Sequence, residues 1–539
     1  MRKRKMWKHL VVGSLLLFGA GACADLEVVN QNDADADRAL SSAGDVQSLI
    51  SGAMNTWWNG MFSNGGSSPF MSNQAFQHNA PWSNFGMEQY GRLPRVAIVN
   101  DVADVYYDYF TRAWYRNYRA IAALADGLKA LDNAEVADEL GAEAVARARA
   151  YAKFMQGLTH ASVAIMYDRG FIVDETTDLT QAQEPIPYTE IMDAALGYFD
   201  EAISLANSAS FTLPSSWMTV DVSSDQLARL ASTYKARFYA AVARTPSERA
   251  ALNWNNVISW IDNGLQEDWV MVWDWNNGWY NGQLDYGVYP YWTQMSYFIY
   301  GMADPNDDRA YDGWLDLGLG EKSYQLPDGS PVLIVTPDQR FPQGSTVEEQ
   351  RATTGAYFRI ATSAEAGDTW KKPERGVWRW SWYKHTRFLE YGWDAVFTQP
   401  DMTVPEMRLL KAEGLYRNGD LAGAAAIVNE TRTAWGLSAT DASGTNTSCV
   451  PRLPNGDCGG LLEMLKWEKR METAHSGIAG VGWWYDSRGW GDLWFETPLQ
   501  FPIPCKELQV LQILPCNTYG GPGGEMGAAM STYAWPSEG

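Results

Sequence analysis

The chain has 539 residues, enough for several domains or for one elaborated domain, and its 42 basic and 64 acidic residues give a net charge of −22. Because such a surface repels phosphate backbones, the composition argues against nucleic-acid binding. Hydrophobic residues make up 46% of the chain and charged residues 20%, which is typical of a folded globular protein. The 26 Trp and 27 Tyr are unusual, and they predict either an aromatic-rich core or exposed faces that stack on a ligand.

Residues 1–22 have the pattern of a signal peptide for export. A basic stretch, MRKRKMWKH, precedes an apolar run that is too short to span a bilayer. Cys23 follows the small residues Gly21 and Ala22, which resembles a bacterial lipobox. We therefore predict a lipid on Cys23, with residues 23–42 as a tether to the membrane. The alternative is an ordinary secretory signal in which Cys23 carries no lipid.

Most of segment 43–265 predicts helices, because apolar residues recur there at three- and four-residue steps. The same periodicity returns in segment 401–475. Within it, Ala412 and Ala424 would lie where two helices touch, and Gly419-Asp420 would form the turn between them. This unit looks like a tetratricopeptide repeat, so we predict an all-α, tetratricopeptide-like α-solenoid scaffold.

Residues 266–400 are rich in Gly, Pro, Asp and aromatic residues and show little periodicity. We predict a long irregular, aromatic-rich insertion there, with a short strand at Val332–Val335. Residues 476–539 are also rich in Gly and Pro, and we predict an irregular C-terminal region.

The insertion and its flank supply the candidate ligand-binding residues. Segment 254–292 holds seven Trp, and Asp274-Trp275-Asn276-Asn277-Gly278-Trp279 combines indole rings with amide and carboxylate side chains. Indole faces stack on sugar rings while such polar groups bind the hydroxyls. The candidates are Trp82, Trp273, Trp275, Trp279, Tyr286 and Trp292. The alternative is that these rings fill a core beneath long loops.

Four late cysteines, Cys449, Cys458, Cys505 and Cys516, are candidates for disulfides. Of their three possible pairings, the local one (449 with 458, 505 with 516) closes two small loops and suits an oxidising, exported compartment. Their spacing lacks the short Cys-x₂₋₄-Cys pattern of zinc sites. No nucleophile, metal-hydrolase or phosphate-loop motif is present, so we predict no catalytic residue, no metal and no cofactor.

An ordered series of motifs along the chain resembles the RagB/SusD-type outer-membrane lipoproteins. The similarity begins with Cys23-Ala24-Asp25-Leu26 and spans nearly all of the chain after the signal peptide. The later motifs are Tyr118-Arg119-Ala120-Ile121, 142–154, Tyr167-Asp168-Arg169-Gly170, Glu184-Pro185-Ile186-Pro187, Asp308-Arg309, Tyr383-Lys384, 409–413, Asn429 with Arg432, 468–472 and Phe501-Pro502-Ile503-Pro504. Their order is more specific than any one of them.

This resemblance implies a non-catalytic, surface-facing lipoprotein of the outer membrane. Such a protein captures a nutrient, an oligosaccharide or a peptide, for a TonB-dependent outer-membrane transporter of the SusC type. Two alternatives remain open on sequence alone. One is an exported helical glycoside hydrolase with similar Trp subsites, and the other is an envelope scaffold that binds no small ligand.

Overall fold

The computed structural model describes residues 40–535 of the chain, except for positions 41, 64, 283–286, 288–291, 307–309, 368–370, 389–395, 477–478, 518, 522–528, 530, 532 and 534. The signal peptide, Cys23 and most of the 23–42 tether therefore lie outside the described residues, and so does Tyr286. Among the described residues, no helix combines the length and the apolar character that a membrane span requires.

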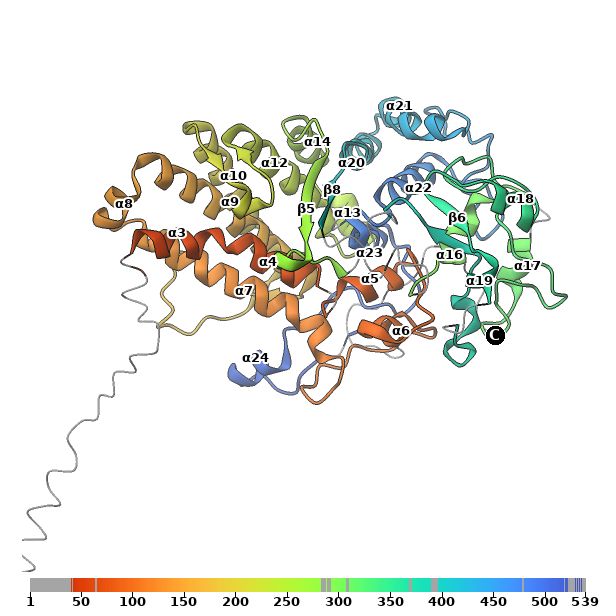
Figure 1. The fold of residues 1–539 in the computed structure, drawn as a ribbon, viewed down its shortest axis with the longest axis horizontal. Coiled ribbons are helices and arrows are strands. Elements are labelled where there is room, and N and C mark those ends of the chain that lie inside the picture. Colours follow the sequence, from red (N-terminus) through yellow and green to blue (C-terminus); the bar gives the residue numbers. More distant parts are fainter. Residues whose placement is uncertain are drawn as a thin grey trace, which may run out of the picture.

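Helices dominate the first half of the chain (Figure 1). In chain order they are α3 (Ala43–Ser51), α4 (Ala53–Met61), α5 (Ser68–Gln74), α6 (Met87–Gly91), α7 (Tyr107–Ala130), α8 (Ala134–Leu140), α9 (Ala142–Met166), α10 (Tyr188–Ser208), α11 (Ser215–Met218), α12 (Ser224–Ala241), α13 (Pro246–Ala251) and α14 (Trp254–Asp262). Helix α4 packs on α7, and α9, α10, α12 and α14 pack on one another in turn. Segment 43–265 is therefore mostly helical, as expected of an all-α fold.

The row of helices continues after the insertion, where α14 packs on α20 (Val404–Arg417) and α20 packs on α21 (Leu421–Arg432). Gly419 has a positive φ of 87° at the turn, and the Asp420 side chain accepts a hydrogen bond from the Gly423 backbone N–H. Ala412 and Ala424 are fully buried between these helices. The helical hairpin predicted from these residues is confirmed.

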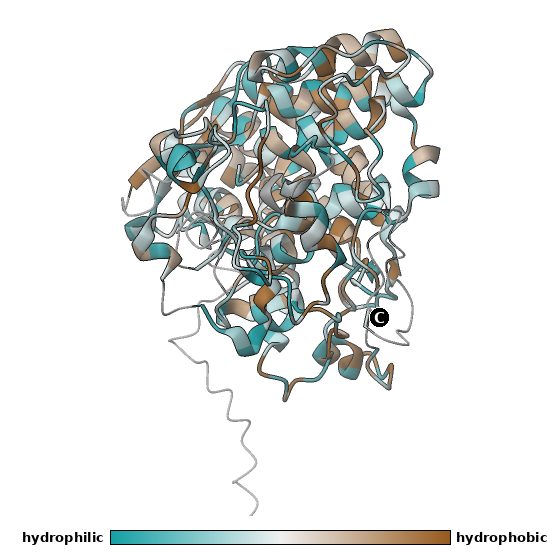
Figure 2. Ribbon diagram, turned by 90° about the vertical axis from the view of Figure 1, so that its right-hand side faces the viewer, coloured by the Kyte–Doolittle hydropathy of each residue, from teal (hydrophilic) through white to brown (hydrophobic). Residues whose placement is uncertain are grey.

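Local sequence explains why the helices begin where they do. Ser223 and Gln226 form a reciprocal capping box at the start of α12, and Thr403 caps α20. Figure 2 shows that many helical ribbons carry both hydrophilic and hydrophobic residues, as amphipathic helices do when one face packs on a core. Tertiary burial then holds the helices together.

Strands are few and short, and each pairs with one antiparallel partner among the described residues. The pairs are β1 (Arg169–Gly170) with β2 (Ile186–Pro187), β3 (Thr212–Leu213) with β4 (Val222–Ser223), β5 (Trp269–Asp274) with β8 (Val396–Met402), and β6 (Phe358–Ile360) with β7 (Tyr383–His385). The pair β5–β8 joins the two ends of the predicted insertion. In Figure 1 this pair lies beside α14 and α20, while the helices α16, α17, α18 and α19 of the insertion lie on the right of the molecule.

The insertion is less irregular than predicted, because it also holds short helices. These are η2 (Trp275–Asn277), α16 (Tyr297–Tyr300), η3 (Gly301–Ala303), α17 (Ala310–Asp316), α18 (Val347–Ala352), α19 (Ser363–Ala366), η4 (Pro373–Arg375) and η5 (Val377–Arg379). Its aromatic side chains Phe298, Tyr300 and Trp314 are fully buried in the main core. The predicted strand at Val332–Val335 is wrong: this segment is buried but forms no ladder.

The C-terminal region was predicted to be irregular, and this is wrong for two segments. After η7 (Thr433–Trp435) and α22 (Leu461–Thr473), the chain forms α23 (Ala479–Trp490) and then α24 (Cys505–Val510). Helix α23 contains three glycines, which lower its intrinsic helical propensity. Trp483 and Trp484 on this helix are buried in the main core, and that packing outweighs the propensity.

Candidate functional site

The turn that follows β5 presents an aromatic side chain to solvent. The Asp274 carboxylate accepts hydrogen bonds from the backbone N–H groups of Asn276 and Asn277, at 3.0 and 3.2 Å, and so caps η2. Gly278 closes the turn with a positive φ of 81°. Trp275, at the tip of this turn, is 61% exposed. An indole this exposed can stack on the face of a ligand.

Trp275 lies beside Tyr280, with ring centroids 4.5 Å apart and planes tilted by 49°. Asn276 and Asn277 are exposed next to these rings. We call Trp275, Tyr280, Asn276 and Asn277 the tip platform. It combines aromatic faces with amide groups, the two elements that bind a sugar ring and its hydroxyls.

Helix α4 fixes the position of the tip platform. Asn55 and Asn59 each donate a side-chain hydrogen bond of 3.0 Å to the Gly278 carbonyl. The Trp58 indole N–H donates to the Tyr280 carbonyl at 2.9 Å. A platform held on a helix at several points needs little ordering when a ligand binds.

Two of the predicted residues lie beneath the platform. Trp273 is only 4% exposed, and its ring packs against Phe397 with centroids 4.3 Å apart. Alternation along β5 turns Trp273 toward the core, so this predicted residue lies beneath the exposed face of the platform and not on it. Trp279 is half-buried and packs edge-on against Trp58, with centroids 5.8 Å apart, so it supports the platform from within.

A second aromatic pair brings together two residues that are far apart in sequence. Trp82 and Trp292 are half-buried and meet edge-to-face, with centroids 6.1 Å apart. Cations of Lys372 and Arg375 lie 5.9 and 5.3 Å from the centroid of the Trp82 ring. We call Trp82, Trp292, Lys372 and Arg375 the Trp82 patch. The sequence reasoning identified both rings but missed both cations.

The helical scaffold has another surface hollow, of about 400 Å³, that sequence reasoning also missed. It lies between α10, α12 and α14 and is lined by Asn207, Asp225, Arg229, Trp260 and Asn263, among others. Trp260 is half-buried there, and Lys235 lies 4.6 Å from its ring centroid. A polar hollow of about 360 Å³ beside α18 and β6 contains no aromatic residue.

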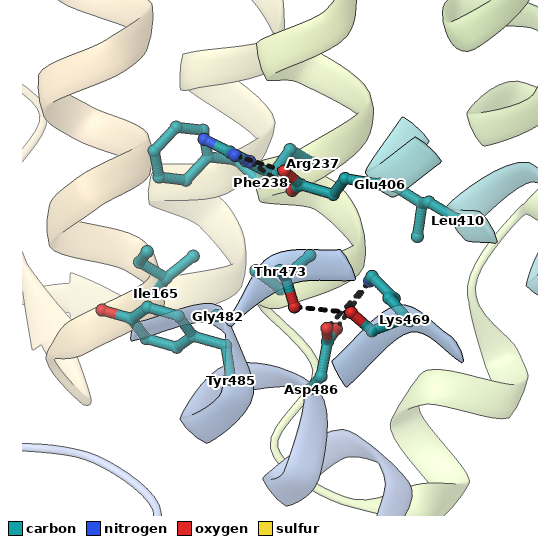
Figure 3. Close-up of a pocket in the computed structure, with 11 residues that line it drawn as sticks. Ile165, Arg237, Phe238, Glu406, Leu410, Lys469, Thr473, Gly482, Tyr485 and Asp486 are labelled. Carbon is teal, nitrogen blue, oxygen red and sulfur yellow. Dashed lines mark hydrogen bonds and ion pairs between the residues drawn. The ribbon is translucent and has the colours of Figure 1, made fainter. Parts of the chain in front are cut away.

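The cavity in Figure 3 is interior and too small for a nutrient, with about 30 Å³ of free space, enough for about one water molecule. Its charged side chains point at one another. Arg237 pairs with Glu406 at 2.7 Å, and Lys469 pairs with Asp486 at 2.8 Å. These ion pairs link α12 with α20 and α22 with α23, so the charged groups of the cavity serve the packing of the helices.

Three histidines from distant segments meet in the core. The ring of His475 lies 5.3 Å from that of His78 and 4.4 Å from that of His385, between centroids. Burial lowers the pKa of His78 to about 3, and the nearby Pro69 backbone opposes this less strongly. Burial also holds the pKa values of His385 and His475 well below 6.5. The three imidazoles are therefore neutral at neutral pH. Within the described residues, no group of three or more His, Cys, Asp or Glu side chains is arranged to hold a metal ion.

The four late cysteines form two disulfides, Cys449 with Cys458 and Cys505 with Cys516. This is the local pairing favoured by the sequence analysis. Both bonds lie in the C-terminal third of the chain, away from the tip platform in sequence.

This chain matches solved structures, but it matches no family model and no curated sequence. A SusD superfamily protein from Bacteroides vulgatus ATCC 8482 has a TM-score of 0.51 at 14% identity, and the match covers 89% of this chain and 99% of that one. A SusD superfamily protein from Bacteroides fragilis has a TM-score of 0.50 at 14% identity, over 88% and 99%. A SusD homolog from Parabacteroides distasonis ATCC 8503 has a TM-score of 0.51 at 13% identity, over 82% and 84%. The chain therefore has the SusD fold over most of its length, as its resemblance to RagB/SusD proteins predicted.

Proposed function

We propose that this protein is a nutrient-binding lipoprotein of the cell surface. A lipid on Cys23 would anchor it to the outer membrane, where it would capture an oligosaccharide or a peptide and pass it to a TonB-dependent transporter. The export pattern of residues 1–22 and the SusD fold support this proposal.

The tip platform is the observation that carries the binding role. Its exposed Trp275, the adjacent Tyr280 and the neighbouring amides form a preorganised surface on a rigid helix. Because sugar rings present C–H-rich faces and many hydroxyls, this combination favours an oligosaccharide over a peptide.

The same site argues for binding without hydrolysis. A glycoside hydrolase needs two carboxyl groups that face each other across the sugar, about 5–9.5 Å apart. Asp274 is the only acidic residue in segment 269–282, and its oxygens accept three hydrogen bonds, from the backbone and side chain of the η2 turn. It is therefore occupied as a cap and does not serve as a general acid.

A panel of neutral and acidic oligosaccharides, titrated by calorimetry against the purified chain, tests the binding role. We expect saturable binding without new reducing ends, and a loss of affinity of about tenfold or more in Trp275→Ala, since stacking contributes about 1–3 kcal/mol per ring. Phe495→Ala is the matched control, because Phe495 is also an exposed aromatic residue, at 42%. New reducing ends would establish an enzyme instead. If Trp275→Ala bound the ligand as tightly as the unaltered chain, the tip platform would not be the binding site.

The anchor and the partner need separate tests. Labelling with radioactive palmitate should modify the chain and should be lost in Cys23→Ala. A TonB-dependent transporter should copurify after extraction in mild detergent. A chain that carries no lipid, or one that is isolated without a partner, would contradict the corresponding part of the proposal.

A further inference from the structure

Basic side chains from two distant segments converge around the Trp82 patch. Five cations form this group, which we call the cation cluster: Arg92, Arg95, Lys372, Arg375 and Arg379. Hydrogen bonds join the two segments: Arg375 donates to the Pro81 carbonyl at 3.4 Å, and Arg379 donates to the Ala80 carbonyl at 3.1 Å. The convergence is therefore built into the fold.

The two inner arginines are almost fully buried and lie close enough to repel each other. Arg95 donates to Thr497 Oγ1 at 2.9 Å and to the Gln74 carbonyl at 2.8 Å. Burial and the neighbouring Arg379 lower the pKa of Arg95 to about 9. Burial likewise lowers the pKa of Arg379 to about 10, although Glu88 opposes that shift. The partners that accept these hydrogen bonds from Arg95 are neutral, and Arg379 has a carboxylate partner in Glu88.

The five cations outnumber the acidic groups near them: Glu88 and Asp104 act on Tyr106 together with Arg375, and Glu374 precedes Arg375 in the chain. Glu88, whose carboxylate lies 3.6 Å from Arg379, is the one carboxylate in the described ranges that forms an ion pair with any of the five cations. Lys372 and Arg375 are half-buried and Arg92 is exposed. A mobile anion can therefore reach all three.

This arrangement stands out in a chain with a net charge of −22. The overall charge repels an acidic ligand, so a local cation cluster is required if such a ligand is to bind. Guanidinium groups match carboxylates in a bidentate geometry, and the rings of Trp82 and Trp292 can pack against the sugar that carries the carboxylate.

We propose that the cation cluster and the Trp82 patch bind the carboxylate groups of an acidic, uronate-containing oligosaccharide. This inference rests on the proposed function and narrows its ligand class. The outer cations Lys372, Arg375 and Arg92 contact the ligand carboxylates. Arg95 and Arg379 supply a fixed positive field from beneath.

Matched probes test the inference. The full chain in detergent is titrated with a galacturonic acid hexamer, with its fully methyl-esterified, neutral form and with a hexaglutamate peptide. We expect the acidic hexamer to bind about tenfold or more tightly than the esterified one, with an affinity that falls as salt rises from about 50 to about 300 mM. The double variant Lys372→Gln/Arg375→Gln should lose that preference and keep its melting temperature. The control Arg119→Gln/Lys129→Gln removes two exposed cations from α7 and should change nothing.

The outcomes separate this inference from the proposed function. Equal affinity for both hexamers, or an unchanged preference in the Lys372→Gln/Arg375→Gln variant, overturns the inference while the function stands, provided that Trp275→Ala still weakens binding. If the chain binds hexaglutamate but does not bind the galacturonic acid hexamer, the inference is overturned and the ligand is an acidic peptide. Absence of binding to any oligosaccharide in the panel overturns both.

Discussion

Arginine has opposite surroundings in two regions of this molecule. At the junction of the helical scaffold with α23, Arg249 is fully buried and pairs with Glu413 at 2.6 Å and with Asp486 at 3.0 Å. Burial alone would raise the pKa of Glu413, but the Arg249 guanidinium outweighs it and lowers that pKa to about 2. Around Trp82, by contrast, the five cations of the cluster form a single ion pair among the described residues, between Arg379 and Glu88. The paired charges at the first site stabilise the fold, whereas the outer cations at the second site are available to a ligand.

The largest effect should come from breaking the paired junction. Glu413→Gln leaves Arg249 buried without its main partner, so we expect the free energy of unfolding to fall by about 3–5 kcal/mol. Urea denaturation followed by tryptophan fluorescence measures it. The double variant Arg249→Met/Glu413→Leu should recover most of the loss, since neither charge is then left alone. A loss below about 1 kcal/mol in Glu413→Gln would mean that the pair is not needed.

Substitutions of Trp273 and Trp275, which lie two residues apart, should differ in their cost in stability by almost as much. Trp273→Ala removes a core ring and should cost about 3–5 kcal/mol of stability. Trp275→Ala removes an exposed ring and should cost less than about 0.5 kcal/mol, while it weakens ligand binding. Melting temperatures of the two variants, measured side by side, check this. Similar destabilisation in both would show that the tip of the turn is part of the core.

Because the core histidines are neutral, we expect the free energy of unfolding to depend on pH, with an effect of intermediate size. The pKa of His78 is about 3 when folded and about 6.5 when exposed, so between these values the unfolded chain binds one more proton. Stability contributed by the neutral state is then present above pH 6.5 and falls as pH falls, by about 2 kcal/mol from about pH 7 to about pH 5 for this histidine. His78→Leu should reduce the measured loss of stability over that range by this amount. An unchanged dependence on pH would contradict the burial of a neutral imidazole.

The smallest effect should come from an exposed ion pair. Arg408 pairs with Glu430 across α20 and α21, and both side chains are more than two-fifths exposed. Because solvent screens such a pair, Arg408→Gln should cost about 0–1 kcal/mol in the same urea titration. A cost as large as that of Glu413→Gln would remove the distinction between exposed and buried pairs.

Local sequence rules predicted the scaffold well because they act over short distances. The turn at Gly419-Asp420 and the buried contact of Ala412 with Ala424 both follow from residues within one hairpin. The same rules failed at α23. Its glycines have a low helical propensity, but its buried tryptophans stabilise the helix by packing in the core. Alternation along β5 accounts for the buried Trp273, but it would place Trp275 on the same face. Trp275 is exposed because β5 ends at Asp274 and the η2 turn begins at Trp275, and the sequence analysis did not locate that boundary.

The candidate site was predicted only in part because its pieces come from distant segments. Trp82 and Trp292 could be identified as unusual rings, but their contact depends on the fold. Nothing local joins Arg92 and Arg95 to the basic residues of segment 372–379. Contacts between distant segments, among them the hydrogen bonds of Arg375 and Arg379 to the carbonyls of Pro81 and Ala80, bring these cations together.

The central claim, that the exposed aromatic surface binds the nutrient, can be tested most directly by oxidative footprinting of the tryptophans. The chain is oxidised with and without a saturating amount of the oligosaccharide that binds most tightly in the panel, and each tryptophan is quantified by mass spectrometry. We predict strong protection of Trp275 and an unchanged reactivity of Trp260, which lies in a separate hollow on the helical scaffold. Equal oxidation of Trp275 with and without bound ligand would contradict the account.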